Sequence, residues 1–143
     1  MGRSVIGACC ILMCSVVLSA QQAGEGPRVV GTVRDIMRQM VMPSSDVVFG
    51  AGAEEPKTDA DWEKVRLNAV QLAESANLLL MGSRVRDRGD WVKFANATVD
   101  AADAVVKLAA AKKSDGLAEA SDKAYETCTT CHNKYWADRN APK

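Results

Sequence analysis

The stretch LAEASDKAYETCTTCHNKY, residues 117–135, decides the fold. Small or apolar residues recur along it at steps of three and four, which is the spacing of one face of an α-helix. That face comprises Leu117, Ala120, Ala124, Cys128, Cys131 and Tyr135. The stretch therefore predicts a helix whose buried face carries two cysteines.

Two earlier stretches have the same periodicity. One runs from a predicted capping box at Thr58–Asp61 to Leu79, and the other begins at the predicted cap Asp90 and reaches Leu108. Their apolar faces are Trp62, Val65, Ala69, Leu72, Ala76 and Leu79 in the first, and Trp91, Phe94, Thr98, Ala101, Val105 and Leu108 in the second. Steps of three and four sustained over several turns suit helices that pack side by side in a bundle.

A fourth apolar face lies nearer the N-terminus. It comprises Val30, Val33, Met37, Met40 and Val41. Pro27 suits the first turn of this helix, Pro43 is expected to end or kink it, and residues 50–57 are expected to form a loop. No stretch alternates with period two, so the chain is predicted to be all-α, an antiparallel four-helix bundle.

Composition agrees with a single globular domain. The chain has 143 residues, of which 48% are hydrophobic and 25% are charged. The 18 lysines and arginines balance 18 aspartates and glutamates. A general nucleic-acid binder normally carries a basic excess, so that class of protein is disfavoured.

The first 20 residues have the layout of a secretory signal peptide. A short basic start precedes an apolar run at residues 4–18, and the small residues Ser19 and Ala20 follow. The apolar run is shorter than the roughly 18–20 residues of a spanning helix. We expect cleavage after Ala20, export to the periplasm, and a mature domain of residues 21–143 without a membrane span. The alternatives are cleavage at Ser19 or Ala23, or an uncleaved membrane anchor.

Cleavage would leave only two cysteines, Cys128 and Cys131, beside the single histidine, His132. Cys-x-x-Cys-His is the attachment motif of c-type haem. Residues three apart on a helix share a face, so two thiols can add to two vinyl groups on one porphyrin edge while the histidine binds iron. We expect one covalently attached haem c between the helices. A thioredoxin-type pair lacks its preceding strand, a zinc site lacks a fourth ligand, and a lone disulfide leaves His132 unexplained.

The late position of the motif adds a further indication. With four predicted helices and Tyr135 three residues after His132, the mature chain resembles the class II cytochromes c, the cytochrome c′ family. The resemblance implies a periplasmic haem protein, and a homodimer by analogy with family members. The chain departs from the family pattern where Trp136 replaces an arginine after the histidine, and where Val33, with Arg34 adjacent, replaces one before the distal residue.

The sixth iron ligand separates two branches of that family. Candidates in the first helix are Met37, Met40 and Met42, of which Met42 falls on the opposite face against Pro43. A helical wheel places Met37 and Met40 equally close to the centre of the apolar face, whereas alignment with the family implies Met37. Ligation by methionine predicts an electron carrier whose partners are redox proteins. The alternative is five-coordinate haem that binds nitric oxide or other small gases.

Two further expectations concern enzyme activity and surface charge. Without a second histidine the chain shows no catalytic constellation, so we expect it not to be an enzyme. Arg84, Arg86 and Arg88 fall in one loop. The simplest interpretation is a solvated turn, and the alternative is a docking patch for an acidic redox partner.

Overall fold

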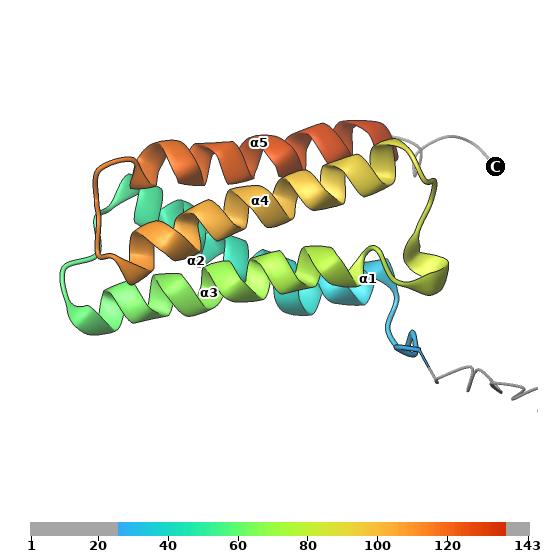
Figure 1. The fold of residues 1–143 in the computed structure, drawn as a ribbon, viewed down its shortest axis with the longest axis horizontal. Helices are drawn as coiled ribbons and strands as arrows, with labels where there is room; N and C mark the ends of the chain where they lie inside the picture. The colour runs from blue at the N-terminus through green and yellow to red at the C-terminus, as the bar shows by residue number, and fades with distance from the viewer. Residues whose placement is uncertain (1–25, 137–143) are drawn as a thin grey trace, which may run out of the picture.

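The computed structural model describes residues 26–136, and every regular element among them is helical (Figure 1). The elements are α1 (Val33–Ile36), η1 (Met37–Val41), α2 (Met42–Ala53), α3 (Asp59–Leu78), η2 (Gly82–Arg84), α4 (Asp90–Ala110) and α5 (Leu117–Tyr135). The all-α prediction is therefore confirmed. The signal sequence predicted at residues 1–20 lies outside the described residues, and none of the described helices is both long and apolar enough to cross a membrane.

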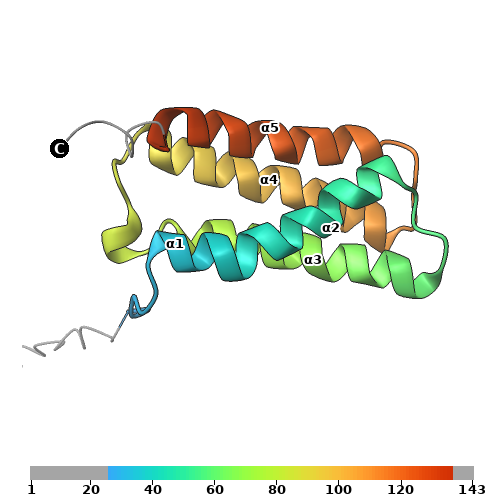
Figure 2. The same ribbon diagram turned by 180° about the vertical axis from the view of Figure 1, so that it is seen from behind.

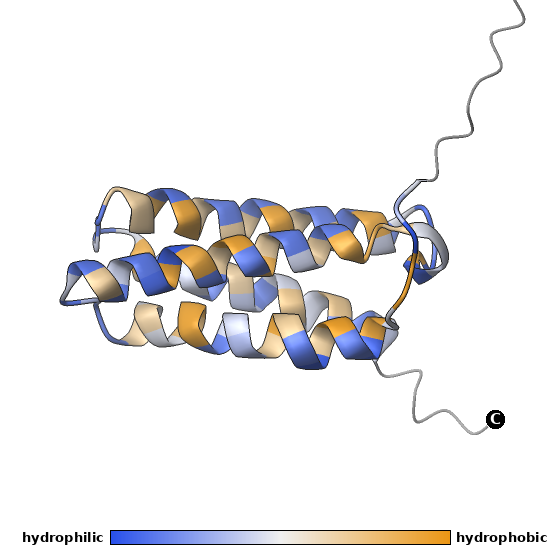
Figure 3. Ribbon diagram, turned by 90° about the horizontal axis from the view of Figure 1, so that it is seen from below, coloured by the Kyte–Doolittle hydropathy of each residue, from blue (hydrophilic) through white to orange (hydrophobic). Residues whose placement is uncertain are grey.

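The helices pack as four antiparallel rods. The segments α1, η1 and α2 follow one another as a single bent rod that contacts α3 and α5, while α4 contacts α3 and α5. Figures 1 and 2 show that the start of α1, the end of α3, the start of α4 and the end of α5 meet at one end of the bundle. Figure 3 shows apolar and polar residues distributed in turn along each rod, as amphipathic helices require.

The faces predicted from periodicity form much of the core. All six residues of the Trp62–Leu79 face are buried, and Trp91, Ala101 and Val105 are buried on α4. On α5 the face is buried at Leu117 and Ala124 but only half-buried at the two cysteines. Small side chains such as Ala69, Ala102 and Ala124 are fully enclosed, so the rods approach closely.

The start of the first rod differs from the prediction. Pro27 lies before any helix, and α1 begins at Val33 after a capping box in which Thr32 and Asp35 exchange side-chain and backbone hydrogen bonds. A capping box satisfies two backbone N–H groups at a helix start, which Pro27 cannot do. Capping therefore overrides proline preference here.

Pro43 does not end the helix either. Five residues of π-helix, η1, precede it, and α2 continues beyond it to Ala53, so Gly50–Ala53 are helical rather than part of the predicted 50–57 loop. The missing proline N–H and the ring clash four residues back are accommodated by a wider turn. Of the two expectations for Pro43, an end to the helix is wrong, and an irregularity in a continuing helix is what the structure has.

Two smaller predictions about turns also need correction. Gly89, not Asp90, is the N-cap of α4, and Asp87 Oδ1 accepts hydrogen bonds from the N–H groups of Gly89 and Trp91. Arg84 is not part of a solvated turn, because it is only 8% exposed. Its guanidinium donates to the carbonyls of Gly31 and Leu78, which ties the chain before α1 to the end of α3.

Gly52 marks the closest approach of α2 to α5. A Cβ built at this position would lie 2.6 Å from Ser121 Cβ and 3.6 Å from Ala118 Cα. Ser121 Oγ donates to Val48 O at 3.0 Å, which holds the two helices at this spacing. Only glycine fits between them without moving a backbone.

We expect Gly52→Ala to lower the free energy of unfolding by about 1–3 kcal/mol, because the added methyl group forces α2 away from α5. The matched control is Gly50→Ala, two residues earlier on the same helix, where nothing lies within 4 Å. That change should raise stability by about 0.5–1 kcal/mol, since alanine is the better helix former. Urea unfolding followed by far-ultraviolet circular dichroism compares them. Equal effects of the two substitutions would contradict the close approach.

Candidate functional site

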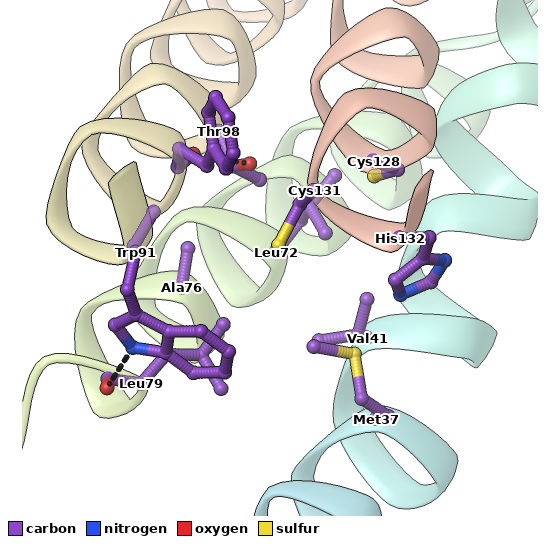
Figure 4. A pocket seen from close by; sticks show the side chains of 12 residues that line it. Met37, Val41, Leu72, Ala76, Leu79, Trp91, Thr98, Cys128, Cys131 and His132 are labelled. Atoms are coloured by element: carbon purple, nitrogen blue, oxygen red, sulfur yellow. Dashed lines mark hydrogen bonds between the residues drawn. The ribbon is translucent and has the colours of Figure 1, made fainter. Parts of the chain in front are cut away.

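A small apolar cavity lies near the end of the bundle where α1 starts and α5 ends (Figure 4). Its volume is about 40 Å³, room for a few water molecules at most. The cavity is lined by Met37, Val41, Leu72, Ala76, Leu79, Trp91, Phe94, Ala95, Thr98, Cys128, Cys131 and His132. All four rods contribute to it, so the complete bundle is needed to build this site.

The four residues predicted as a ligand set meet at this cavity. Cys128, Cys131 and His132 enter it from the last two turns of α5, and Met37 enters from η1 on the neighbouring first rod (Figure 4). Met40, the rival that the helical wheel could not exclude, is not among the lining residues. Met42 is 57% exposed, as its position on the wheel predicted.

The π-helical segment explains why Met37 and Met40 are no longer equivalent. Within η1 the Met42 N–H donates to Met37 O, five residues back. Ser44 Oγ lies 2.6 Å from Met40 O, and Gln71 Nε2 on α3 donates to the same carbonyl at 3.2 Å. The wider turn changes the angular spacing that the wheel assumed, and Gln71 fixes the segment against α3.

The two thiols lie in a shielded environment. Cys128 and Cys131 are half-buried and form no disulfide with each other. Burial raises the pKa of both thiols above the ordinary value; a hydrogen bond from Thr127 opposes the rise at Cys128, and the neighbouring Cys128 adds to it at Cys131. Burial therefore disfavours the thiolate form of both cysteines, which is the form that reacts in a thioredoxin-type pair.

The turn of α5 that carries His132 is anchored to the start of α4. Tyr135 Oη donates to Asp87 Oδ2, and Lys134 Nζ pairs with Asp90 Oδ2. The Tyr135 ring packs edge-on against Trp91, with ring centroids 5.0 Å apart. The position of the imidazole therefore depends on contacts three residues further along the helix.

Trp91 and a pair of threonines hold the walls of the cavity. Trp91 Nε1 donates to Leu79 O at 2.9 Å, which joins α4 to the end of α3. Thr98 Oγ1 donates to Thr127 Oγ1 at 3.1 Å, and Thr127 Oγ1 donates to Ala124 O at 2.7 Å. Sequence periodicity counted Thr98 as a face residue but gave no signal that its hydroxyl would bridge α4 and α5.

The donor set fits a c-type haem, although the cavity volume alone does not. Two thiols on one helix face, an adjacent imidazole and a facing thioether match its covalent and axial attachments. Apolar and aromatic side chains form nearly all of the remaining wall. A porphyrin is much larger than 40 Å³, so binding requires the lining side chains, and the rods behind them, to move apart.

No family model, no curated protein and no solved structure matches this chain. Among the residues that the structure describes, no group of three or more histidine, cysteine, aspartate or glutamate side chains is placed to hold a metal ion. A structural zinc site built from such side chains therefore has no geometric support.

Tyr135 makes the stability of the fold around the site depend on pH in the alkaline range. Burial, with Asp87 as the hydrogen-bond acceptor, raises the pKa of Tyr135 to about 12. An unfolded tyrosine ionises near pH 10, so this contribution to stability is present below about pH 10 and is lost as the pH rises toward 12. We expect Tyr135→Phe to be less stable than wild type at neutral pH and to lose less stability across that window. The midpoints of urea unfolding at several pH values measure the difference. If the midpoints of wild type and Tyr135→Phe fall by the same amount between about pH 10 and about pH 12, the contribution of the Tyr135–Asp87 hydrogen bond is refuted.

Proposed function

We propose that the protein is a periplasmic monohaem c-type cytochrome that carries electrons and catalyses no reaction of its own. The observation that supports this most strongly is the meeting of Cys128, Cys131, His132 and Met37 at one apolar cavity. The N-terminal sequence supports the compartment, since residues 1–20 have the layout of an export signal. The low-spin, methionine-ligated branch of the cytochrome c′ family is the proposed class.

Each of the four residues has a distinct proposed role. Cys128 and Cys131 would hold the haem covalently through thioether bonds to its two vinyl groups, each thiol adding its sulfur to one vinyl carbon and its proton to the other. His132 and Met37 would bind the iron. When bound, the haem supplies one-electron chemistry between ferrous and ferric iron.

The surrounding residues favour a carrier. A thioether ligand and an apolar environment both favour the reduced, less charged state, which raises the reduction potential. Leu72, Leu79 and Trp91 are buried around the cavity and exclude water from it. Tyr135 and Asp87 hold the α5 turn in place, which reduces rearrangement when charge changes.

Five-coordinate haem that binds small gases is the competing function. It requires that Met37 stay away from the iron position. The location of Met37 in the cavity wall, while Met40 and Met42 lie elsewhere, favours the six-coordinate carrier. The visible spectra of wild type, Met37→Ala and Met40→Ala distinguish the two functions.

The first test concerns covalent attachment. Protein produced with export and a c-type haem maturation system should keep its colour on the chain after extraction with acidified organic solvent, because thioethers survive that treatment. Cys128→Ala/Cys131→Ala should lose the colour, while Cys14→Ala, which falls within the predicted signal sequence, should keep it. Complete extraction of the colour from wild type would refute the covalent haem.

The second test concerns the sixth ligand. Wild type should be low-spin with the weak far-red methionine-to-iron band. Met37→Ala should become high-spin and bind carbon monoxide readily, whereas Met40→Ala, three residues along the same segment, should keep the wild-type spectrum. High-spin wild-type protein would favour the gas-binding function, and loss of the band in Met40→Ala alone would move the ligand to Met40.

A further inference from the structure

Charge is divided unequally between the two ends of the bundle. The pocket half, defined as residues 26–41, 72–98 and 128–136, contains every residue that lines the cavity. Its charged residues are Arg28, Arg34, Arg38, Arg84, Arg86, Arg88, Lys93 and Lys134 against Asp35, Glu74, Asp87 and Asp90. The far half, residues 42–71 and 99–127, carries seven lysines and arginines against twelve aspartates and glutamates. A chain with balanced total charge therefore has a positive end at the cavity and a negative end opposite.

Ion pairs neutralise most of the lysines and arginines of the far half but few of those at the cavity end. Five of the six ion pairs among the described residues lie in the far half: Lys57–Glu54, Arg66–Glu63, Lys107–Asp103, Lys112–Asp59 and Lys123–Glu126. The pocket half has only Lys134–Asp90. Arg34, Arg38, Arg86, Arg88 and Lys93 are exposed, and none of them pairs with a described carboxylate. The excess positive charge at the cavity end is thus directed toward solvent.

The carboxylates of the pocket half are held by local structure. Asp35 accepts hydrogen bonds from Thr32 in the α1 capping box. Asp87 accepts from Tyr135 and from the backbone N–H groups at the start of α4, and these bonds lower its pKa. These acids stabilise helix ends, and they do not neutralise the exposed arginines through contact.

The segments that carry these positive side chains lie at the same end of the bundle as the last turns of α5, which contain His132. Arg34 and Arg38 lie one helical turn apart at the start of the first rod, and Arg86 and Arg88 lie in the connection between α3 and α4. Both segments sit at the end of the bundle where α5 finishes (Figure 1). Trp136 at that end is 49% exposed, with its ring centroid 4.9 Å from that of His132. An exposed aromatic with charged neighbours is the usual composition of a protein-docking surface.

We infer that the cavity end of the bundle is the docking surface for a redox protein whose own electron-transfer site is surrounded by carboxylates. The inference rests on the proposed electron-carrier function and specifies the partner's surface chemistry. Opposite local charges raise association rates even where net charges are small, and they orient the two proteins so that their redox sites face each other. With a mature net charge of −1, orientation depends on this local excess.

A protein surface fits this end better than an anionic membrane does. Asp35, Asp87 and Asp90 lie among the arginines, and a uniformly anionic surface would repel them. A partner protein can place neutral or basic groups opposite these three acids and carboxylates opposite the arginines. Membrane binding is therefore an outcome that the experiment has to distinguish.

The experiment measures oxidation of the reduced haem protein by two inorganic complexes of opposite charge. Hexacyanoferrate(III) is the anionic probe and tris(phenanthroline)cobalt(III) is the cationic probe. Raising the ionic strength from about 10 mM to about 300 mM screens exposed charges. We expect the hexacyanoferrate rate to fall several-fold and the cobalt rate to rise, although the mature chain is slightly negative overall.

Matched variants locate the surface. Arg34→Gln/Arg38→Gln and Arg86→Gln/Arg88→Gln should each lower the hexacyanoferrate rate at low ionic strength, by about threefold to tenfold. Lys64→Gln/Lys113→Gln removes the same charge from exposed, unpaired lysines of the far half and should change that rate by less than about twofold. Visible spectra identical to wild type show that the ligands are intact in each variant.

The experiment distinguishes failure of the docking inference from failure of the electron-carrier function. If both probes oxidise the haem but neither arginine variant differs from the lysine control, the docking inference is wrong and the carrier function stands. If neither probe changes the oxidation state of the haem, the carrier function fails and the inference fails with it. Co-sedimentation of wild type with phosphatidylglycerol vesicles, lost in Arg34→Gln/Arg38→Gln, would assign the surface to a membrane and overturn docking to a protein.

Discussion

The geometry of the cavity depends on how the first rod accommodates Pro43. A proline inside a helix removes one backbone donor and crowds the preceding turn. The chain responds with the π-helical segment η1, and Ser44 and Gln71 supply donors to the Met40 carbonyl. Because π-helical segments are uncommon and concentrate at functional sites, their presence beside the cavity is informative. Met37, which opens this segment, is the methionine that reaches the cavity wall.

The helices are held together by different kinds of contact at Gly52 and at the cavity. Around Gly52 and Ser121, α2 and α5 are as near as their backbones allow, and several alanines of the seams are fully buried. Near His132 the seam residues are larger, and the rods are joined by specific hydrogen bonds from Trp91, Thr98 and Tyr135. Polar bridges can keep their partners through small rotations, whereas interlocked alanines cannot.

The sequence predicted the elements with strong periodicity and missed those set by individual contacts. The faces beginning at Trp62 and Trp91 were recognised because the same spacing persists over several turns, and the Thr58 capping box was recognised from its residue types. The start at Val33 and the passage through Pro43 were missed because proline preference was weighted above capping and π-helix formation. The burial of Arg84 has no local signature, since its acceptors, Gly31 O and Leu78 O, are set by tertiary structure.

In the candidate site, too, the sequence predicted residues that belong to a motif and missed features that depend on where residues lie in the fold. Cys128, Cys131 and His132 could be named from the sequence because their spacing is dictated by the reaction that it suits. The helical wheel could not choose between Met37 and Met40, because it assumes the uniform spacing of a regular helix; only the family resemblance implied Met37. Total charge was equally uninformative, since a balance of 18 against 18 hides the separation of the excess arginines from the excess carboxylates. Because α1 and the α3–α4 connection fold to the same end of the bundle, that end carries more lysines and arginines than carboxylates although the whole chain is balanced.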